Sequence, residues 1–404
     1  MTSPGRRLSG LERIWLMADR LAPPFVNQLV LEAPTGHLDG VDWDAAVAEA
    51  ARAVPGISVR LRGVLGWTRW APGPAPCLVR IADSTWDGQC GGRAAFLTSA
   101  INPRTGPVAE VVLVPGPTPR LVLRTHHAAL DGRGTLLFME ALGRVARGEE
   151  PGFIPHDATT DLELARALGA AAPEPVSADC VSPLGTASPA PFGVRWARRR
   201  VDGPTAGLLA RAAAALASEV PTGQRARVRI DVPVDLRRHR PALRSTGNLT
   251  GLIRLPMAAV TAAADPVSRI AEQLRDGLRT AQEARFPLVP RVLAWLPVSL
   301  IAPFARQAAR RSLATGAFST SATISNLGRL DLAAFSVPGF APTRAFFIPP
   351  GSPGLPLFLT LTGDAEGVTL CGSAPLALAS NGRLEALLDA LAARLARPLG
   401  DDAP

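Results

Sequence analysis

LVLRTHHAALDGRG, at residues 121–134, is the most informative stretch of this sequence. Its first half predicts an apolar strand that ends in two adjacent histidines, His126 and His127. A polar turn containing Asp131 follows, and we expect a helix over about residues 135–147. Neighbouring residues on a strand point to opposite faces, so one histidine can face a cleft while the other supports the backbone. The glycines after the histidines give the chain the freedom to turn and bring Asp131 back beneath them.

The sequence before and around this stretch alternates between short helices and short strands, which glycines and prolines separate. The pattern predicts a strand-rich sheet with covering helices over residues 1–150. The expected helices lie at 9–21 and 42–54, and the expected strands at 25–32, 57–61, 67–70, 77–81, 110–114 and 121–125.

Residues 151–190 are rich in Pro, Ala, Ser and Asp, and we interpret them as a linker. Residues 191–404 then repeat the mixed strand and helix pattern, which predicts a second domain. Its most apolar stretch, at 288–304, contains several prolines. This favours a buried helix pair or the wall of an acyl channel over a membrane span, which needs about 20 largely apolar residues. Contact of this stretch with a membrane surface is an alternative that the pattern does not favour.

The composition is that of a globular protein, with 47% hydrophobic and 19% charged residues in a chain of 404. The formal net charge is +9, and Lys is absent, so every basic side chain is an arginine. Codon bias in a GC-rich genome explains the missing Lys more simply than function does. The alternative is attraction to an acidic partner or a phosphate-bearing cofactor. The arginines are scattered and not interleaved with aromatic residues, which disfavours nucleic-acid binding.

The cysteine pattern predicts neither a metal site nor a disulfide framework. Cys77, Cys90, Cys180 and Cys371 are widely spaced, and no pair has metal-ligand spacing. No secretory signal follows the N-terminal arginines. We therefore expect a cytoplasmic protein without a metal centre.

Three motifs occur in one order along the chain. The first is His-His-x-x-x-Asp-Gly at 126–132. The second is Val-Asp-Leu-Arg at 234–237 followed by Gly-Asn at 247–248, and the third is Ser-Asn-Leu-Gly at 325–328. The set resembles the condensation-domain superfamily, which includes chloramphenicol acetyltransferase and the condensation domains of nonribosomal peptide synthetases. The resemblance implies an α/β (α+β) fold of two chloramphenicol-acetyltransferase-like lobes, a V-shaped pseudo-dimer with a tunnel between the lobes.

The same resemblance implies roles for individual residues. His127, as the second histidine of the motif, would be the general base, with His126 and Gly132 beside it in the active-site motif. Asp131 would be structural, held by an arginine, for which we choose Arg60 over Arg62.

The other two motifs imply further roles. Ser325 or Asn326 would donate a hydrogen bond to the tetrahedral oxyanion, or position the substrate, although a simple strand end is an equal alternative. Asp235 and Arg237 of the second motif are expected to pair structurally rather than to react.

The function implied is acyl transfer from a thioester to a hydroxyl or amine, in natural-product or lipid biosynthesis. The donor would be acyl-CoA or a phosphopantetheinyl carrier-protein thioester, with no cofactor bound to the enzyme itself. A carrier protein acting in trans and a small-molecule acceptor would be the partners. One alternative is a freestanding condensation enzyme that joins carrier-bound substrates through an amide or ester. A second is a degenerate, non-catalytic module that recruits a partner.

Overall fold

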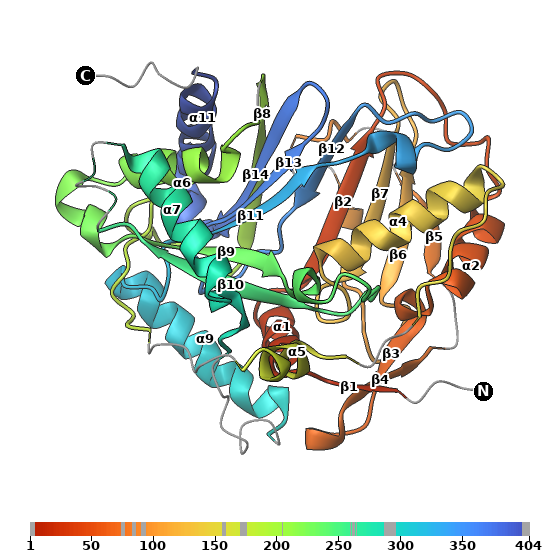
Figure 1. Cartoon of the computed structure of the whole chain (residues 1–404), viewed down its shortest axis with the longest axis horizontal. Helices are drawn as coiled ribbons and strands as arrows, with labels where there is room; N and C mark the ends of the chain where they lie inside the picture. Colours follow the sequence, from red (N-terminus) through yellow and green to blue (C-terminus); the bar gives the residue numbers. More distant parts are fainter. Residues whose placement is uncertain are drawn as a thin grey trace.

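The computed structural model is a mixed α/β molecule built around two sheets, as the sequence predicted (Figure 1). It describes residues 5–397 except for 74–76, 83–85, 90–93, 156–158, 170–175, 204, 259, 261–262, 264 and 287–295. Cys90, part of the expected linker and residues 288–295 of the apolar stretch at 288–304 lie outside the described residues. In the rest of that stretch Leu300 and Phe304 are exposed, so the expected burial is wrong there.

The first sheet has five strands and is covered by two helices. The strands are β2 (Val26–Glu32), β5 (Leu78–Ile81), β6 (Ala109–Val114), β7 (Arg120–His126) and β12 (Arg344–Ile348), and the helices are α2 (Trp43–Ala53) and α4 (Gly132–Ala146). The strand order across the sheet is β12-β2-β7-β6-β5. Neighbours are antiparallel except for β5 and β6, and β6 and β7 form the antiparallel pair expected from the sequence.

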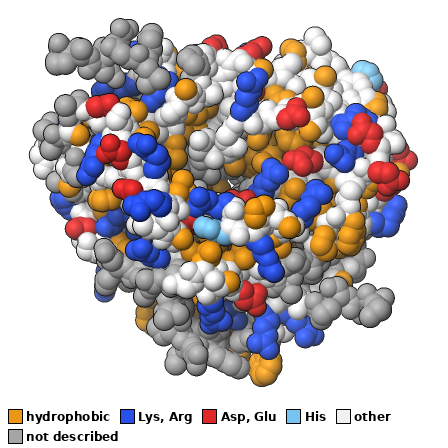
Figure 2. Space-filling view, in the orientation of Figure 1, with side chains coloured by type: hydrophobic (Ala, Val, Ile, Leu, Met, Phe, Trp, Pro, Cys, Tyr) orange, Lys and Arg blue, Asp and Glu red, His pale blue; other side chains and the backbone are white. Residues whose placement is uncertain are grey.

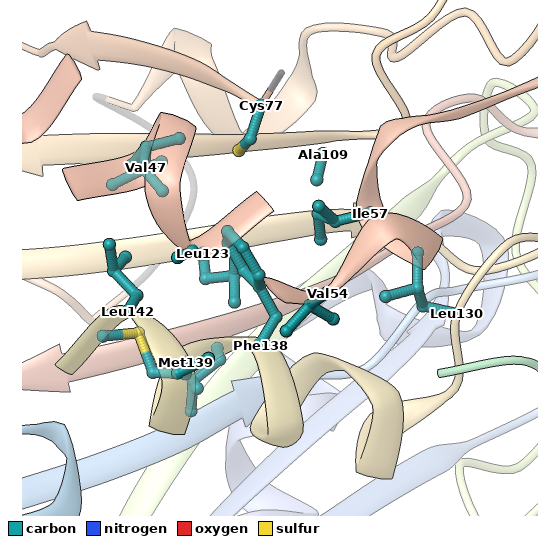
Figure 3. Close-up of a cluster of buried hydrophobic side chains, with 14 of the residues drawn as sticks. Val47, Val54, Ile57, Cys77, Ala109, Leu123, Leu130, Phe138, Met139 and Leu142 are labelled. Carbon is teal, nitrogen blue, oxygen red and sulfur yellow. The ribbon is translucent and has the colours of Figure 1, made fainter. Parts of the chain in front are cut away.

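A hydrophobic core between this sheet and its helices anchors the histidine motif (Figure 3). Phe138 and Leu142 of α4 pack there with Val47 of α2 and Leu123 of β7. Leu130, inside the motif turn, belongs to the same core and is 0% exposed. Burial of one such side chain contributes about 1.5–3 kcal/mol, so the turn that follows His127 is fixed by its own leucine.

The second sheet has six strands and belongs to the second half of the chain. Its strands are β8 (Val194–Asp202), β9 (Arg229–Asp235), β10 (Thr250–Pro256), β11 (Ala322–Arg329), β13 (Phe358–Gly363) and β14 (Gly367–Pro375), with the helices α6 (Leu208–Ser218), α7 (Pro266–Arg279) and α11 (Arg383–Leu395). The order is β10-β9-β11-β13-β14-β8. β11 runs parallel to β9 and β13, and the other neighbours are antiparallel.

β12 joins the two sheets, because it comes from the second half of the sequence and pairs with β2 of the first sheet. Its Phe346 is fully buried and lies 6.4 Å from the Trp196 ring of β8, centroid to centroid. The Arg198 guanidinium stacks 4.1 Å from the centre of the same Phe346 ring and also pairs with Glu32 of β2. The first sheet therefore contains a strand from outside residues 1–150. A division of the chain at 150 and 190 remains a prediction.

A smaller layer of elements closes one end of the molecule. It consists of β1 (Arg6–Arg7), β3 (Val59–Arg62) and β4 (Arg69–Pro72), which form a three-stranded sheet, with α1 (Gly10–Leu21), α5 (Asp161–Ala167) and α9 (Val298–Thr315). Ser9 caps α1 in a reciprocal pair of hydrogen bonds with Glu12. Short helices complete the described chain, namely α3 (Ala95–Thr98) and α10 (Leu376–Ala379). Across the described residues, no helix combines the length and the apolar character that a membrane crossing requires.

Phe346→Ala should destabilise the protein, because it opens a cavity where the two sheets meet. We expect a loss of about 3–5 kcal/mol in the free energy of unfolding, measured by urea denaturation. Leu252→Ala, on β10 and 37% exposed, is the matched control and should change the same quantity much less. Equal effects of the two variants would mean that β12 does not join the sheets as described.

Candidate active site

The turn after the histidines is built as the start of α4. Asp131 is the residue that caps this helix, and its Oδ1 accepts a hydrogen bond from the Gly134 backbone N–H at 2.7 Å. The Thr135 hydroxyl donates to the Asp131 carbonyl at 2.9 Å. An aspartate at this position satisfies an otherwise unpaired N–H and suits the positive end of the helix dipole. Gly132 is the first residue of the helix, so the motif turn and the helix start are one structure.

The Asp131 carboxylate also binds the second half of the chain. Arg237 Nη1 donates to Asp131 Oδ2 at 3.0 Å, and Arg237 Nη2 to Oδ1 at 3.3 Å. The Leu249 backbone N–H donates to Oδ2 at 3.0 Å. Asp131 and Arg237 are only 2% and 7% exposed, so this charge pair is buried and well hydrogen-bonded. The aspartate therefore holds its own loop and fastens it to β9 and β10.

The choice of Arg60 as the partner of Asp131 is wrong. Arg60 lies in β3 of the small sheet, opposite Ala71 of β4, and its buried Nε has no hydrogen-bond partner. Arg237 instead lies in the short helix η5 (Leu236–His239), directly after β9. The expected pairing of Asp235 with Arg237 is confirmed, at 2.8 Å, so one guanidinium binds two carboxylates. The short helix that reaches Asp131 comes from the other half of the chain, which sequence proximity could not indicate.

The segment after Arg237 packs tightly against the start of α4. Arg237 donates to the carbonyls of Ser245 and Gly247, and so shapes this loop. A Cβ added to Gly134 would collide with the Thr246 carbonyl oxygen. Gly134 is therefore required for the close approach of the two backbones, in addition to any role in the turn.

His126 is fully buried and supports the loop. Its Nδ1 accepts a hydrogen bond from the Ala128 backbone N–H at 3.2 Å. In the neutral ring the proton then resides on Nε2, which lies 3.8 Å from Asp19 Oδ2. His126 is thus held through Nδ1, as expected for the supporting member of the pair, whereas its buried Nε2 has no hydrogen-bond partner among the described residues.

His127 is held so that its Nε2 carries the free lone pair. Its Nδ1 lies 3.2 Å from the Leu130 carbonyl oxygen, which can only accept, and 3.3 Å from the Asn27 amide nitrogen, which can only donate. We assign the proton to Nδ1, because the carbonyl is the nearer of the two groups and Asn27 already donates to that carbonyl. Asn27 of β2 donates to the same oxygen at 2.9 Å and fixes it in place. The His127 ring is stacked on Trp15 and Phe25, at centroid distances of 5.0 and 5.5 Å. Among the described residues, no hydrogen-bond partner contacts Nε2.

Burial lowers the pKa of His127 to about 4, although the hydrogen bond with the Leu130 carbonyl and the charge of Asp131 oppose the shift. The stacking rings of Trp15 and Phe25 supply much of the surroundings that exclude water. His127 is therefore a neutral imidazole at neutral pH, and its Nε2 can accept a proton.

A cavity of about 570 Å³ lies where the first turn of α4 faces β11. Asp131 and Gly132 line it from the first half, and Ser325 and Asn326 line it from the second, so the structure brings these motifs together. Asn326 is exposed, and its Oδ1 accepts from the Gly328 N–H at 3.1 Å, as in an ordinary turn. The residues that line the cavity, within the part of the chain that the structure describes, do not include His127.

Several residues that shape the site were not predicted. Asn27, Trp15 and Phe25 all contact the His127 ring, yet none belongs to the motif. The places of Phe25 and Asn27 follow from the register between β2 and β7, which pairs Val26 with His126, whereas Trp15 comes from α1. The Val-Asp-Leu-Arg motif did carry a signal for Arg237, but not for its pairing with Asp131.

Solved structures resemble this chain over its whole length. The first condensation domain of the calcium-dependent antibiotic synthetase, in complex with a substrate analogue, is 18% identical with a TM-score of 0.68, and the match covers 100% of this chain and 98% of that one. The chain has the condensation-domain fold. A condensation domain of the monacolin K polyketide synthase is 14% identical with a TM-score of 0.64, covering 98% and 97%.

A mutant starter condensation domain of rhizomide synthetase, in complex with C8-CoA, is 18% identical with a TM-score of 0.63, covering 97% and 95%. No protein-family model and no curated protein sequence matches the chain. The expectation drawn from the three motifs is thus confirmed for the fold of this chain.

Removal of Asp131 or Arg237 should destabilise the protein, because each change leaves a buried charge unpaired. We expect Asp131→Ala and Arg237→Ala each to cost roughly 3–5 kcal/mol of unfolding free energy. A double-mutant cycle should give a coupling energy between these two positions of about 1 kcal/mol or more. The matched cycle of Asp131→Ala with Arg60→Ala should give none. Coupling to Arg60 instead of Arg237 would contradict the pairing.

Proposed function

We propose that the protein is an acyltransferase that moves an acyl group from a thioester to a hydroxyl or amine acceptor, with His127 as the general base. The observation that carries the proposal is the state of His127, a neutral ring fixed through Nδ1 with its Nε2 lone pair free. A base of this kind suits a direct transfer without a covalent enzyme intermediate.

The chemistry requires one proton to move twice. Nε2 of His127 takes the proton from the acceptor as its oxygen or nitrogen attacks the thioester carbonyl carbon. The tetrahedral oxyanion then collapses, the carbon–sulfur bond breaks, and the imidazolium returns the proton to the departing thiolate. We assign stabilisation of the oxyanion to Ser325, Asn326 or the Gly132 N–H, because all three residues line the cavity at the start of α4.

The donor is proposed to be a thioester of CoA or of a phosphopantetheinyl carrier protein. The similar starter domain of rhizomide synthetase was solved with C8-CoA, which favours acyl-CoA as the first donor to test. The condensation domains among the similar structures favour the second candidate, amide or ester formation between carrier-bound substrates.

A donor and acceptor panel followed by mass spectrometry tests the proposal. Acyl-CoA and acyl-carrier donors are each offered with alcohol and amine acceptors. Turnover with acyl-CoA supports the CoA-dependent acyltransferase, and turnover only with carrier-bound partners supports the condensation enzyme. The absence of any acyl transfer across the panel would contradict the proposal and leave a partner-recruiting module.

His127→Ala should abolish transfer while the protein stays folded. The loss of a general base costs roughly 10²–10⁴-fold in rate, seen in kcat with the best substrate pair of the panel. His37→Ala is the control, because the His37 side chain is 62% exposed and should leave the rate unchanged. Near-normal turnover by purified His127→Ala would rule out the base assignment.

The acid limb of the pH–rate profile should fall near pH 4 rather than near 6.5. The folded pKa of His127 is depressed to about 4, so the base is lost only as the pH falls through that value. The unfolded chain binds the proton from about pH 6.5 downward, so stability should also decline between pH 6.5 and 4. Proton NMR titration of the His127 ring, assigned by comparison with His127→Gln, measures the pKa directly. A ring that titrates near 6.5 would contradict the buried environment.

A further inference from the structure

The tip of the β3–β4 hairpin projects apolar side chains into solvent from a well-held backbone. Val64, Leu65 and Trp67 are 66%, 43% and 67% exposed. The Leu65 carbonyl accepts hydrogen bonds from the Thr68 hydroxyl at 2.6 Å and from Arg13 of α1 at 2.8 Å. Because these bonds fix the turn, the exposure of the three side chains is a property of the fold.

Helix α9 exposes a second apolar pair. Leu300 and Phe304 are 57% and 77% exposed and lie four residues apart, so they share one side of the helix. Arg311 continues that side two turns further on and is exposed. The opposite side contains the buried Ala309. The outward side of α9 is therefore apolar in its first half and basic in its second.

Both elements belong to the same end of the molecule. α1 contacts both, since it packs against α9 and its Arg13 binds the hairpin tip. In Figure 1 the hairpin and the first turns of α9 reach the lower edge on either side of α1. The same edge in Figure 2 carries arginine and hydrophobic side chains next to one another. We call this region, formed by the hairpin tip and the outward side of α9, the lower surface.

The lower surface is basic because its two segments contain no carboxylate. Residues 57–73, which contain the hairpin, and 298–315, which form α9, include no Asp or Glu, although the chain has 34 of them. Arg62 and Arg69 flank the hairpin tip and are exposed. No described residue forms an ion pair with either of them or with Arg311. A general excess of arginine does not explain the exclusion of acidic residues from these two segments.

We infer that the lower surface docks the protein on an anionic phospholipid bilayer. Trp67, Leu300 and Phe304 would enter the interface between headgroups and acyl chains, where tryptophan and long apolar side chains are favoured. The arginines would meet the lipid phosphates.

The shape of the surface favours a bilayer over a protein partner. The apolar side chains protrude from two separate elements, and they do not line the cavity at the start of α4. A protein partner would need a surface shaped to fit both projections, whereas a fluid bilayer can adapt its shape to protruding side chains. The inference does not rest on the proposed function. It would place the protein on a membrane, where apolar donors or acceptors are found.

Flotation of the full-length protein with lipid vesicles tests the inference without any turnover. Vesicles of phosphatidylcholine containing phosphatidylglycerol should bind the protein, and added salt should weaken binding, whereas phosphatidylcholine alone should bind it much less. The triple variant Trp67→Ser, Leu300→Ser, Phe304→Ser should lose binding. The control Phe153→Ser, at a side chain 66% exposed and outside the lower surface, should keep it.

A second set of variants tests the charge. Arg62→Gln, Arg69→Gln and Arg311→Gln together should weaken the vesicle partition coefficient by roughly a hundredfold, at roughly fivefold for each arginine. Circular dichroism and melting temperature confirm that every variant is folded, and only folded variants are compared.

Four results would overturn the inference. They are equal binding to neutral and anionic vesicles, no binding to either, unchanged binding by both sets of variants, and a wild-type dimer that the apolar variant splits without any vesicle binding. The last result would assign the surface to a second copy. A fifth such result would be variants that still bind vesicles but lose transfer from a carrier-bound donor, which would assign the surface to a carrier protein.

Discussion

The buried carboxylate of Asp131 is the interaction on which the rest of the site depends. It caps α4, and it takes hydrogen bonds from Arg237 and from the Leu249 backbone. A buried carboxylate is costly unless its lone pairs are filled, and here donors from both halves of the chain fill them. The motif loop can therefore keep this conformation only when the second half is in place. The conformation of the loop is therefore thermodynamically coupled to the association of the two halves.

The state of His127 is a consequence of that arrangement. The loop directs the Leu130 carbonyl at Nδ1, and the hydrophobic core holds the Leu130 side chain. Trp15 and Phe25 cover the ring and lower its pKa, while Nδ1 keeps its proton. No carboxylate is needed to orient the imidazole, since a backbone carbonyl does this, and the ring remains neutral. Packing and rigid backbone geometry position the His127 ring, and burial sets its proton affinity.

The sequence was sufficient for the fold class and for the local structure of the motif, and insufficient for its long-range partners. The strand, turn and helix around His127 follow from local patterns of apolar residues and glycines. Asn27 and Trp15 could not be predicted, because their positions depend on strand register and on helix docking, which a single sequence does not encode locally. The choice of Arg60 rests on the resemblance, which implies an arginine from the early helix-strand unit, whereas Arg237 reaches Asp131 from η5, after a strand that begins more than ninety residues beyond Asp131. Residues that act through backbone atoms, such as Gly134 against Thr246, carry no side-chain signal at all.

The position of β12 in the first sheet has a consequence for synthesis of the chain. β2 is complete by Glu32, but β12, its partner on one side, starts only at Arg344. Until then the ribosome-bound chain holds an unpaired strand edge and the apolar face that Phe346 later covers. Pairing across so long a separation is slow, and exposed edges of this kind invite aggregation. The nascent chain thus carries this exposed edge throughout the synthesis of residues 33–343, which makes protection by chaperones before β12 emerges a determinant of how much native protein a cell obtains.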